Sequence, residues 1–119
     1  MPEKLKRPQR TTTKTTRVTT GCGYIYITEG RSADGLIEVF ASLGKTGGCS
    51  RCQLEAITRL ISLGLKYGIL LKEMLDELSG LRCPNSAWDG GQQILSCPDA
   101  IAKVLKQGQE DSLNSMIAG

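Results

Sequence analysis

Two kinds of hydrophobic spacing occur along the chain: residues 18–41 alternate in the manner of strands, and residues 54–78 and 101–105 repeat at helical spacing. β-branched and aromatic residues fill 18–20 and 24–28, a turn containing Gly and Asp follows, and a second apolar stretch covers 36–41. The alternation is imperfect in both strands, so the sequence leaves their register open. The pattern predicts a β-hairpin with four side chains on its buried face: Ile25, Ile27, Ile37 and Val39.

The helical spacing marks three helices. The first is expected over about residues 50–67 and the second over about residues 71–78. Each is followed by a glycine, Gly68 or Gly80, that permits a left-handed turn. So short a connection predicts a tight corner or a hairpin between these two helices. The third helix is expected to begin at Cys97-Pro98, because proline suits the first helical position.

The two ends of the chain differ from its middle. Residues 1–16 are almost entirely Pro, Lys, Arg, Gln and Thr, which predicts a disordered basic arm. Gly108 is expected to close the third helix, leaving 109–119 as a short C-terminal helix or tail. Residues 17–108 then form one α+β domain, in which a β-hairpin or small antiparallel sheet packs against about three helices.

Charge and composition narrow the chemistry. Residues 1–17 carry six cations against one acid, which leaves a charge of −2 on the rest of a chain whose net charge is +3. The chain has no histidine, which excludes His-based acid–base catalysis and His zinc ligands. No stretch has the pattern of a signal peptide, and no apolar run is long enough to span a membrane. We therefore expect a cytoplasmic protein without membrane contact.

Five cysteines are a high count for 119 residues, and in the cytosol clustered cysteines serve metal or redox chemistry more often than structural disulfides. Cys22 lies between glycines, Cys49 and Cys52 form a C-x-x-C at a helix start, and Cys83 and Cys97 each precede proline. Four thiolates would hold zinc in a closed tetrahedron, which is a structural site. Spacing alone leaves two alternatives open: redox thiols, with Cys49 and Cys52 as the pair, and inert buried thiols.

Three single features have plain structural interpretations. Cys97 stands at the start of a helix, where the positive end of the dipole is expected to favour its thiolate. Asp99, in the first turn, is expected to complement the same dipole. Residues 81–95 show only turn signals, and Trp88 within them is expected to fill an edge of the core.

The stretch Ser96-Cys97-Pro98-Asp99 resembles the hallmark of the TSCPD domain, with Leu95 where that family has Thr. Other segments follow in the family's order, which extends the resemblance from about Arg17 to Leu105. These segments are Thr20-Gly21-Cys22-Gly23 with Tyr24 and Tyr26, Glu38-Val39-Phe40, Gly44 to Cys49, Glu55-Ala56 with Arg59 to Leu63, Leu81 to Pro84, and Trp88.

The resemblance implies a relation to adenosylcobalamin-dependent (class II) ribonucleotide reductases, which carry this domain near their C-terminus. It also singles out Cys22, Cys49, Cys83 and Cys97 as the metal ligands, with zinc inferred from the residue type; Cys52 departs from the family pattern. Ribonucleotide reduction itself needs a barrel of several hundred residues, a radical-bearing cysteine and a cobalamin site. We therefore expect no catalysis from this chain alone.

These expectations define the hypotheses about function. The first is a zinc-stabilised accessory or interaction domain that docks to a ribonucleotide reductase subunit or another protein. The second is a thiol-redox partner of ribonucleoside-diphosphate reductase. The third is a nucleic-acid binder that acts through the basic arm. Pairing of strands across a homodimer is compatible with all three.

Overall fold

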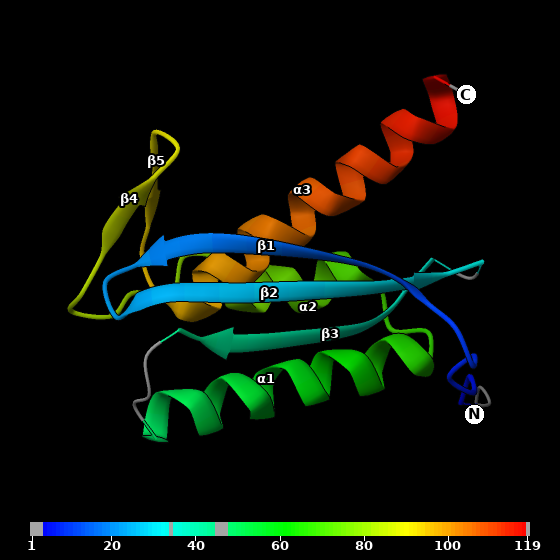
Figure 1. Cartoon of the computed structure of the whole chain (residues 1–119), viewed down its shortest axis with the longest axis horizontal. Helices are drawn as coiled ribbons and strands as arrows, with labels where there is room; N and C mark the ends of the chain where they lie inside the picture. Colours follow the sequence, from blue (N-terminus) through cyan, green and yellow to red (C-terminus); the bar gives the residue numbers. More distant parts are fainter. Residues whose placement is uncertain (1–3, 34, 45–47, 119) are drawn as a thin grey trace.

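The structure is a computed structural model that describes residues 4–33, 35–44 and 48–118, without the side chains of 48–50 and 113–118. Within these residues the chain forms five strands and three helices (Figure 1). In chain order they are β1 (Thr12–Thr20), β2 (Gly23–Ser32), β3 (Gly35–Leu43), α1 (Gly48–Lys66), α2 (Leu71–Leu78), β4 (Ala87–Asp89), β5 (Gln92–Ile94) and α3 (Cys97–Ala118).

The strands β1, β2 and β3 form an antiparallel sheet in sequence order. Val18 pairs with Ile25 and Ile27 with Ala41, while the β2–β3 register shifts between Gly30 and Arg31. An α+β fold with an antiparallel sheet and three helices is therefore confirmed for the described part of the chain. The structure supplies the register that the imperfect alternation had left open.

The strand β1 corrects the expected extent of the arm. Residues 12–16 were predicted as part of a disordered arm, but the strand begins at Thr12 and pairs with β2 as far as Arg31. Four of these five residues are threonine, whose β-branched side chain favours extended backbone. The low hydrophobicity that suggested disorder reflects a strand end whose side chains stay in water.

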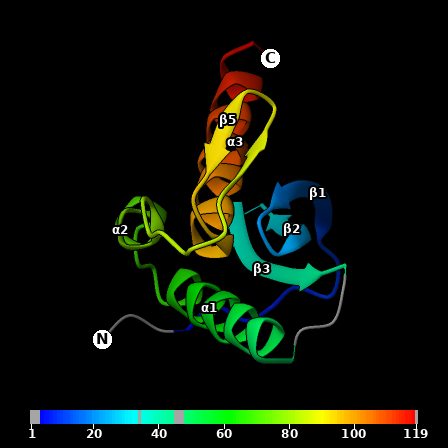
Figure 2. The ribbon, with the colours of Figure 1, turned by 90° about the vertical axis from the view of Figure 1, so that its left-hand side faces the viewer.

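The core lies between the inner face of this sheet and the first turns of α3. Figure 2 shows α3 against one face of the sheet, with α1 along the β3 side and α2 farther away. The four predicted hairpin side chains are all buried, and α3 contributes Ile101 and Leu105, both fully buried. Each such aliphatic side chain stabilises the fold by about 1.5–3 kcal/mol relative to exposure. The buried cluster contains no aromatic residue among the described ones.

Helix α1 covers the free edge of β3. The Ser62 hydroxyl accepts the Val39 backbone N–H at 2.9 Å and donates to the Val39 carbonyl at 3.2 Å. This side chain satisfies backbone groups that an edge strand otherwise leaves unpaired. The α1–α2 corner is as tight as predicted, with Gly68 at φ +82°, and Gly80 after α2 is also left-handed at φ +81°.

Two expectations for the second half of the chain are wrong. Helix α3 runs through Gly108 to Ala118, because Gly108 keeps helical backbone and meets Glu29 across the helix–sheet contact. Trp88 does not fill the core: it is 66% exposed on the small β4–β5 hairpin. The hairpin forms where only a turn was expected, since Gly90 and Gly91 both take positive φ, as a tight two-residue loop requires.

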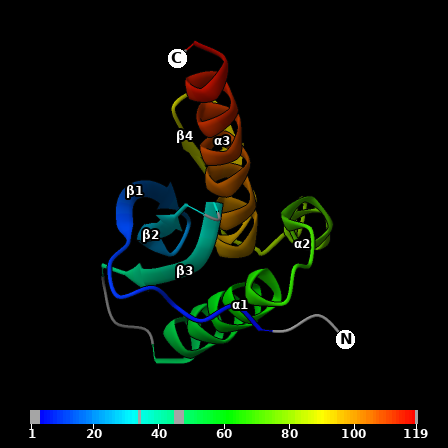
Figure 3. The same ribbon diagram turned by 90° about the vertical axis from the view of Figure 1, so that its right-hand side faces the viewer.

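The described part of the N-terminal arm lies along the molecule. The Leu5 backbone N–H donates to the carbonyl of Lys66 at 2.9 Å, and Arg7 forms a 3.0 Å ion pair with Glu38. Figure 3 shows the arm crossing the C-terminal half of α1 before it enters β1. Among the described helices, none combines the length and apolar character that a membrane crossing requires.

Candidate metal centre

Three of the four cysteines predicted as ligands meet at one end of the sheet. Cys22 lies in the β1–β2 turn, Cys83 in the loop after α2, and Cys97 is the first residue of α3. All three line a cavity of about 150 Å³. The wall opposite them belongs to α1 and contains Gln53, Leu54 and Ile57. Sulfur atoms separated by up to 75 positions in the sequence are thus brought to one place.

The turn that carries Cys22 is held by Thr20 and by a close backbone approach. The buried Thr20 hydroxyl donates to the Gly23 carbonyl at 2.7 Å and accepts the Cys22 backbone N–H at 3.2 Å. Gly21 packs directly on the Cys83 loop, since a Cβ atom there would lie 1.9 Å from the carbonyl oxygen of Asn85. A side chain at position 21 would therefore push the Cys22 turn away from the loop.

The other two thiols are also fixed by hydrogen bonds. The Cys83 backbone N–H donates to the Leu95 carbonyl at 3.0 Å, and its thiol lies 3.2 Å from the Asn85 carbonyl oxygen, which accepts its proton. The Cys97 thiol lies 3.8 Å from the hydroxyl oxygen of Thr20. Thr20 therefore contacts both the Cys22 backbone and the Cys97 sulfur.

The protonation of Cys97 differs from the sequence-based expectation. Burial raises the pKa of the Cys97 thiol above its usual value, and the neighbouring thiols of Cys22 and Cys83 raise it further, against an opposing hydrogen bond to Thr20. The predicted preference for thiolate from the helix dipole is therefore wrong for the metal-free protein. Removal of the sulfur from water is the largest cause of the raised pKa, and it exceeds the opposing effect of the hydrogen bond with Thr20.

The remaining cysteines are both in the first turns of α1. Cys49 is one helical turn before Gln53, a residue of the cavity wall, but its side chain lies outside the described residues. Cys52 is exposed and does not line the cavity. Among the described side chains, no group of three or more Cys, Asp or Glu residues is arranged to hold a metal ion. The described side chains of Cys22, Cys83 and Cys97 thus share a cavity without the arrangement of a metal site.

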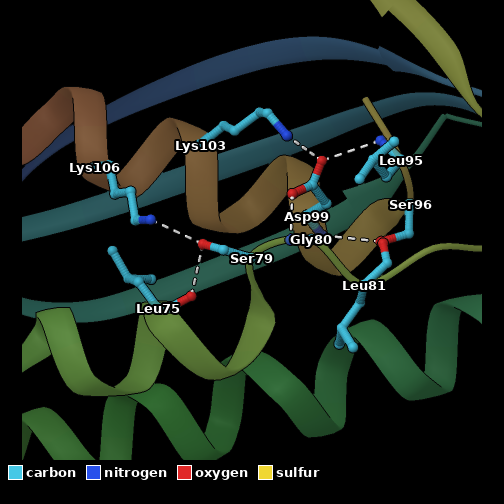
Figure 4. A network of polar contacts seen from close by, with 9 residues as sticks. All are labelled: Leu75, Ser79, Gly80, Leu81, Leu95, Ser96, Asp99, Lys103 and Lys106. Atoms are coloured by element: carbon cyan, nitrogen blue, oxygen red, sulfur yellow. Dashed lines mark hydrogen bonds and ion pairs between the residues drawn. The ribbon is translucent and has the colours of Figure 1, made fainter. Parts of the chain in front are cut away.

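The segment before and after Cys97 joins three parts of the chain (Figure 4). The Ser96 hydroxyl accepts the backbone N–H of Asp99 at 3.1 Å and donates to the carbonyl of Leu81 at 2.6 Å. The Asp99 carboxylate accepts the backbone N–H groups of Gly80 at 2.9 Å and Leu95 at 3.0 Å, and it pairs with Lys103. Ser96 thus caps α3, and Asp99 ties the helix to the end of α2.

The sequence features at these positions match a known family pattern. The pattern of the TSCPD domain matches residues 2–109. The chain belongs to the TSCPD domain family. Ser96 to Asp99 is the motif that gives the domain its name, apart from Leu95 in place of threonine.

One curated relative is a vitamin B12-dependent ribonucleotide reductase from Agrobacterium fabrum (strain C58 / ATCC 33970). It is 35% identical to this TSCPD chain over 75 residues, which are 62% of the chain and 6% of the relative. The chain therefore spans a small fraction of the reductase that it matches. No solved structure matches the chain.

Within the TSCPD motif, Asp99 has a larger structural role than the sequence predicted. It was expected only to complement the helix dipole, but it is 1% exposed and accepts hydrogen bonds from segments before its own helix. Burial alone would raise its pKa, yet hydrogen bonds from Lys103, Gly80 and Leu95 outweigh burial and hold the pKa of Asp99 below its ordinary value. No local signal predicts these partners, because they depend on how the loops pack.

The network extends past Asp99 to the end of α2. The Lys106 ammonium donates to the Ser79 hydroxyl at 2.9 Å, and this hydroxyl donates to the Leu75 carbonyl at 2.8 Å (Figure 4). These contacts hold the end of α2, from which the Cys83 loop continues, against α3. The TSCPD motif therefore positions the cavity, while Cys97 supplies one of its thiols.

Proposed function

We propose that this TSCPD chain is a non-catalytic accessory domain in which Cys22, Cys49, Cys83 and Cys97 hold one structural zinc ion. The observation that supports the zinc site is the shared cavity of Cys22, Cys83 and Cys97, which come from three separate segments. Thiolate sulfur is a ligand that zinc prefers, and a site of four thiolates leaves no position for substrate. Bound zinc would act as a crosslink between the sheet, the Cys83 loop and α3.

The fourth ligand in this proposal comes from α1. Cys49 is one turn before Gln53, whose side chain already lines the cavity. Residues four apart on a helix lie on the same face, which makes position 49 suitable for closing the site. Cys52 is exposed and takes no part in it.

Metal content tests this proposal. Protein purified without chelator should contain about one zinc per chain by elemental analysis, and chelator should lower the melting temperature. Cys97→Ser and Cys83→Ser should lose the zinc, while Cys52→Ser should keep it. Because zinc replaces the protons of its ligands, zinc occupancy should fall as the pH is lowered. A stable protein that contains no zinc and whose melting temperature does not change with chelator would refute the site.

The redox alternative makes a different prediction in the same experiment. Without zinc, mild oxidant should remove two thiols reversibly, and Cys52→Ser should abolish that change if Cys49 and Cys52 are the redox pair. The raised pKa of Cys97 disfavours a redox role for that thiol, since the thiolate is the reactive form.

We also propose that the partner is a ribonucleotide reductase subunit, because the relative that shares this domain is a vitamin B12-dependent ribonucleotide reductase. Leu60 on α1 is 68% exposed and Leu70 before α2 is 67% exposed, so each is an apolar side chain available for such docking. Purified Agrobacterium fabrum reductase, with its own matching segment removed, should co-sediment with this chain. Leu60→Glu should abolish co-sedimentation; a mixture that sediments as two separate species would refute the docking.

A further inference from the structure

No described helix or strand covers the face of the sheet opposite α3, and the N-terminal arm reaches this face at Glu38, where Arg7 pairs with the carboxylate. In Figure 1 this face of β1, β2 and β3 is turned toward the reader, with α2 and α3 behind it. Along β2, the buried Ile25 and Ile27 alternate with Tyr24 and Tyr26, which point to the uncovered side. On β3, Phe40 follows the buried Val39 and points the same way.

Aromatic side chains gather on this uncovered face, although the core is aliphatic. Tyr24, Tyr26 and Phe40, here called the aromatic face, are three of the chain's five aromatic residues. Tyr24 is 49% exposed and Phe40 is 53% exposed. The Arg17 guanidinium lies 4.6 Å from the centre of the Tyr24 ring, so a planar cation already stacks there. Such flat apolar area in water is suited to a flat ligand.

The spacing of the three rings favours separated bases. Tyr24 and Tyr26 are two residues apart on one strand, which places them about 7 Å apart. Phe40 pairs with Thr28 across the β2–β3 ladder, so it is diagonal to Tyr26 at about 7–8 Å. Bases stacked in a duplex rise by about 3.4 Å per step, so only an unstacked single strand can place one base on each ring.

A basic groove borders the aromatic face. A hollow of about 600 Å³ runs between β3 and α1, with Phe40 on the sheet side and Arg51, Arg59 and Lys66 on the helix side. Its carboxylates are already paired: Glu38 with Arg7, and Glu55 with Arg59. Among the described lining residues, Arg51 and Lys66 form no ion pair with a carboxylate, so they remain available to a phosphate backbone.

From these observations we propose that the aromatic face and the β3–α1 groove bind single-stranded nucleic acid. Bases stack on Tyr24, Tyr26 and Phe40, while phosphates contact Arg51 and Lys66. Stacking on exposed aromatic residues of a sheet, beside a basic groove, is a general way to bind single strands with little sequence preference. The site is separate from the cysteine cavity and does not depend on zinc.

Fluorescence anisotropy with a labelled oligonucleotide of 12 nucleotides tests the proposal. Oligo-dT and oligo-U of this length distinguish DNA from RNA, and a duplex of the same length should bind at least tenfold more weakly than the better single strand. Phe40→Ala and Tyr24→Ala should each weaken binding about tenfold to a hundredfold, since stacking of one base is lost. Trp88→Ala, which removes an exposed aromatic residue of the other hairpin, should bind as the unmodified chain does.

Salt dependence tests the groove. Arg51→Ala removes one phosphate contact, so it should reduce the magnitude of the slope of log affinity against log salt concentration by about 1. Lys72→Ala on α2 should leave this slope unchanged. Because these residues are exposed, every variant should keep its melting temperature. The triple variant Lys4→Ala/Lys6→Ala/Arg10→Ala, which keeps the Arg7–Glu38 pair at the groove, should leave most of the single-strand binding and so distinguishes this face from the basic arm.

Several results would overturn the proposal. They are an absence of single-strand binding, equal affinity for duplex, binding that survives loss of both Tyr24 and Phe40, and binding that disappears in the Lys4→Ala/Lys6→Ala/Arg10→Ala variant. Self-association of the chain that Phe40→Ala abolishes would also overturn it, because the face would then be an interface between copies. Metal removal that leaves the fold intact should not change the affinity for single strands. Failure of the zinc proposal can therefore be distinguished from failure of this one.

Discussion

Glu29 and Gly108 touch across the contact between the sheet and α3. A Cβ atom at Gly108 would lie 2.1 Å from Oε1 of Glu29, and the carboxylate itself is 1% exposed. Oε1 pairs with Arg31 at 3.0 Å, while Oε2 is buried without a hydrogen-bond partner among the described residues. A glycine in mid-helix is thus explained by the space that a buried carboxylate needs.

Gly108→Ala should therefore destabilise the protein by about 1–3 kcal/mol, because the extra methyl group overpacks the contact. In an ordinary helix the same change would stabilise by about 1 kcal/mol. Urea unfolding measures the difference. The double variant Glu29→Ala/Gly108→Ala should show a favourable coupling between the two changes. A Gly108→Ala protein more stable than its parent would contradict the observed packing.

Asp99→Ala should destabilise the protein by about 2–4 kcal/mol at pH 7, since the backbone N–H groups of Gly80 and Leu95 lose their acceptor. Its exposed counterpart Asp76, which pairs with Lys72, is the control, and Asp76→Ala should cost less than about 1 kcal/mol. Equal losses for the two variants would show that burial of Asp99 adds nothing.

The same carboxylate predicts a pH dependence. The pKa of Asp99 is lower in the folded protein than its ordinary value, so its stabilisation is present above that ordinary value, about 3.9. It is lost as the pH falls through the folded-state pKa, where the folded protein must also take up the proton. The free energy of unfolding, measured at several pH values between 7 and 2, should fall less steeply for Asp99→Asn than for the parent. Parallel pH profiles would contradict the prediction.

Gly21→Ala should disturb the cysteine cavity. Its methyl group would meet the backbone of Asn85, which cannot move as a flexible side chain would, and should separate Cys22 from the Cys83 loop. Gly35→Ala is the control: Gly35 has φ +94° but open space around its Cβ position. Both changes should lower the melting temperature, but only Gly21→Ala should reduce zinc content. Equal zinc content in the two variants would count against the proposed site.

Thiol reactivity in the metal-free protein should follow exposure and pKa. Cys52 is exposed and should react with iodoacetamide at pH 8 faster than Cys97, because burial raises the pKa of Cys97. Mass spectrometry of peptides from timed samples gives the order, and denatured protein supplies the reference in which the two rates converge. Faster modification of Cys97 than of Cys52 in the folded, metal-free chain would refute this ordering.

Local patterns in the sequence determined the elements of this protein. Alternation placed Ile25 and Ile27 inside, and glycine placement ended the first two helices, because both depend on backbone geometry over a few residues. The TSCPD motif was likewise readable, since its residues are adjacent in the chain. The same local reasoning failed at Gly108, where the glycine makes room for the Glu29 carboxylate of another element.

Only the tertiary structure decided which distant groups meet. Cys22, Cys83 and Cys97 share a cavity because Gly21 lies on Asn85 and because Asp99 binds Gly80, and neither contact has a signature in its own segment. The sequence could not predict the aromatic face for the same reason. Alternation separates the two sides of a strand but does not say which side a helix will cover. Contacts between segments are set by packing of the whole chain, so no short stretch can encode them by itself.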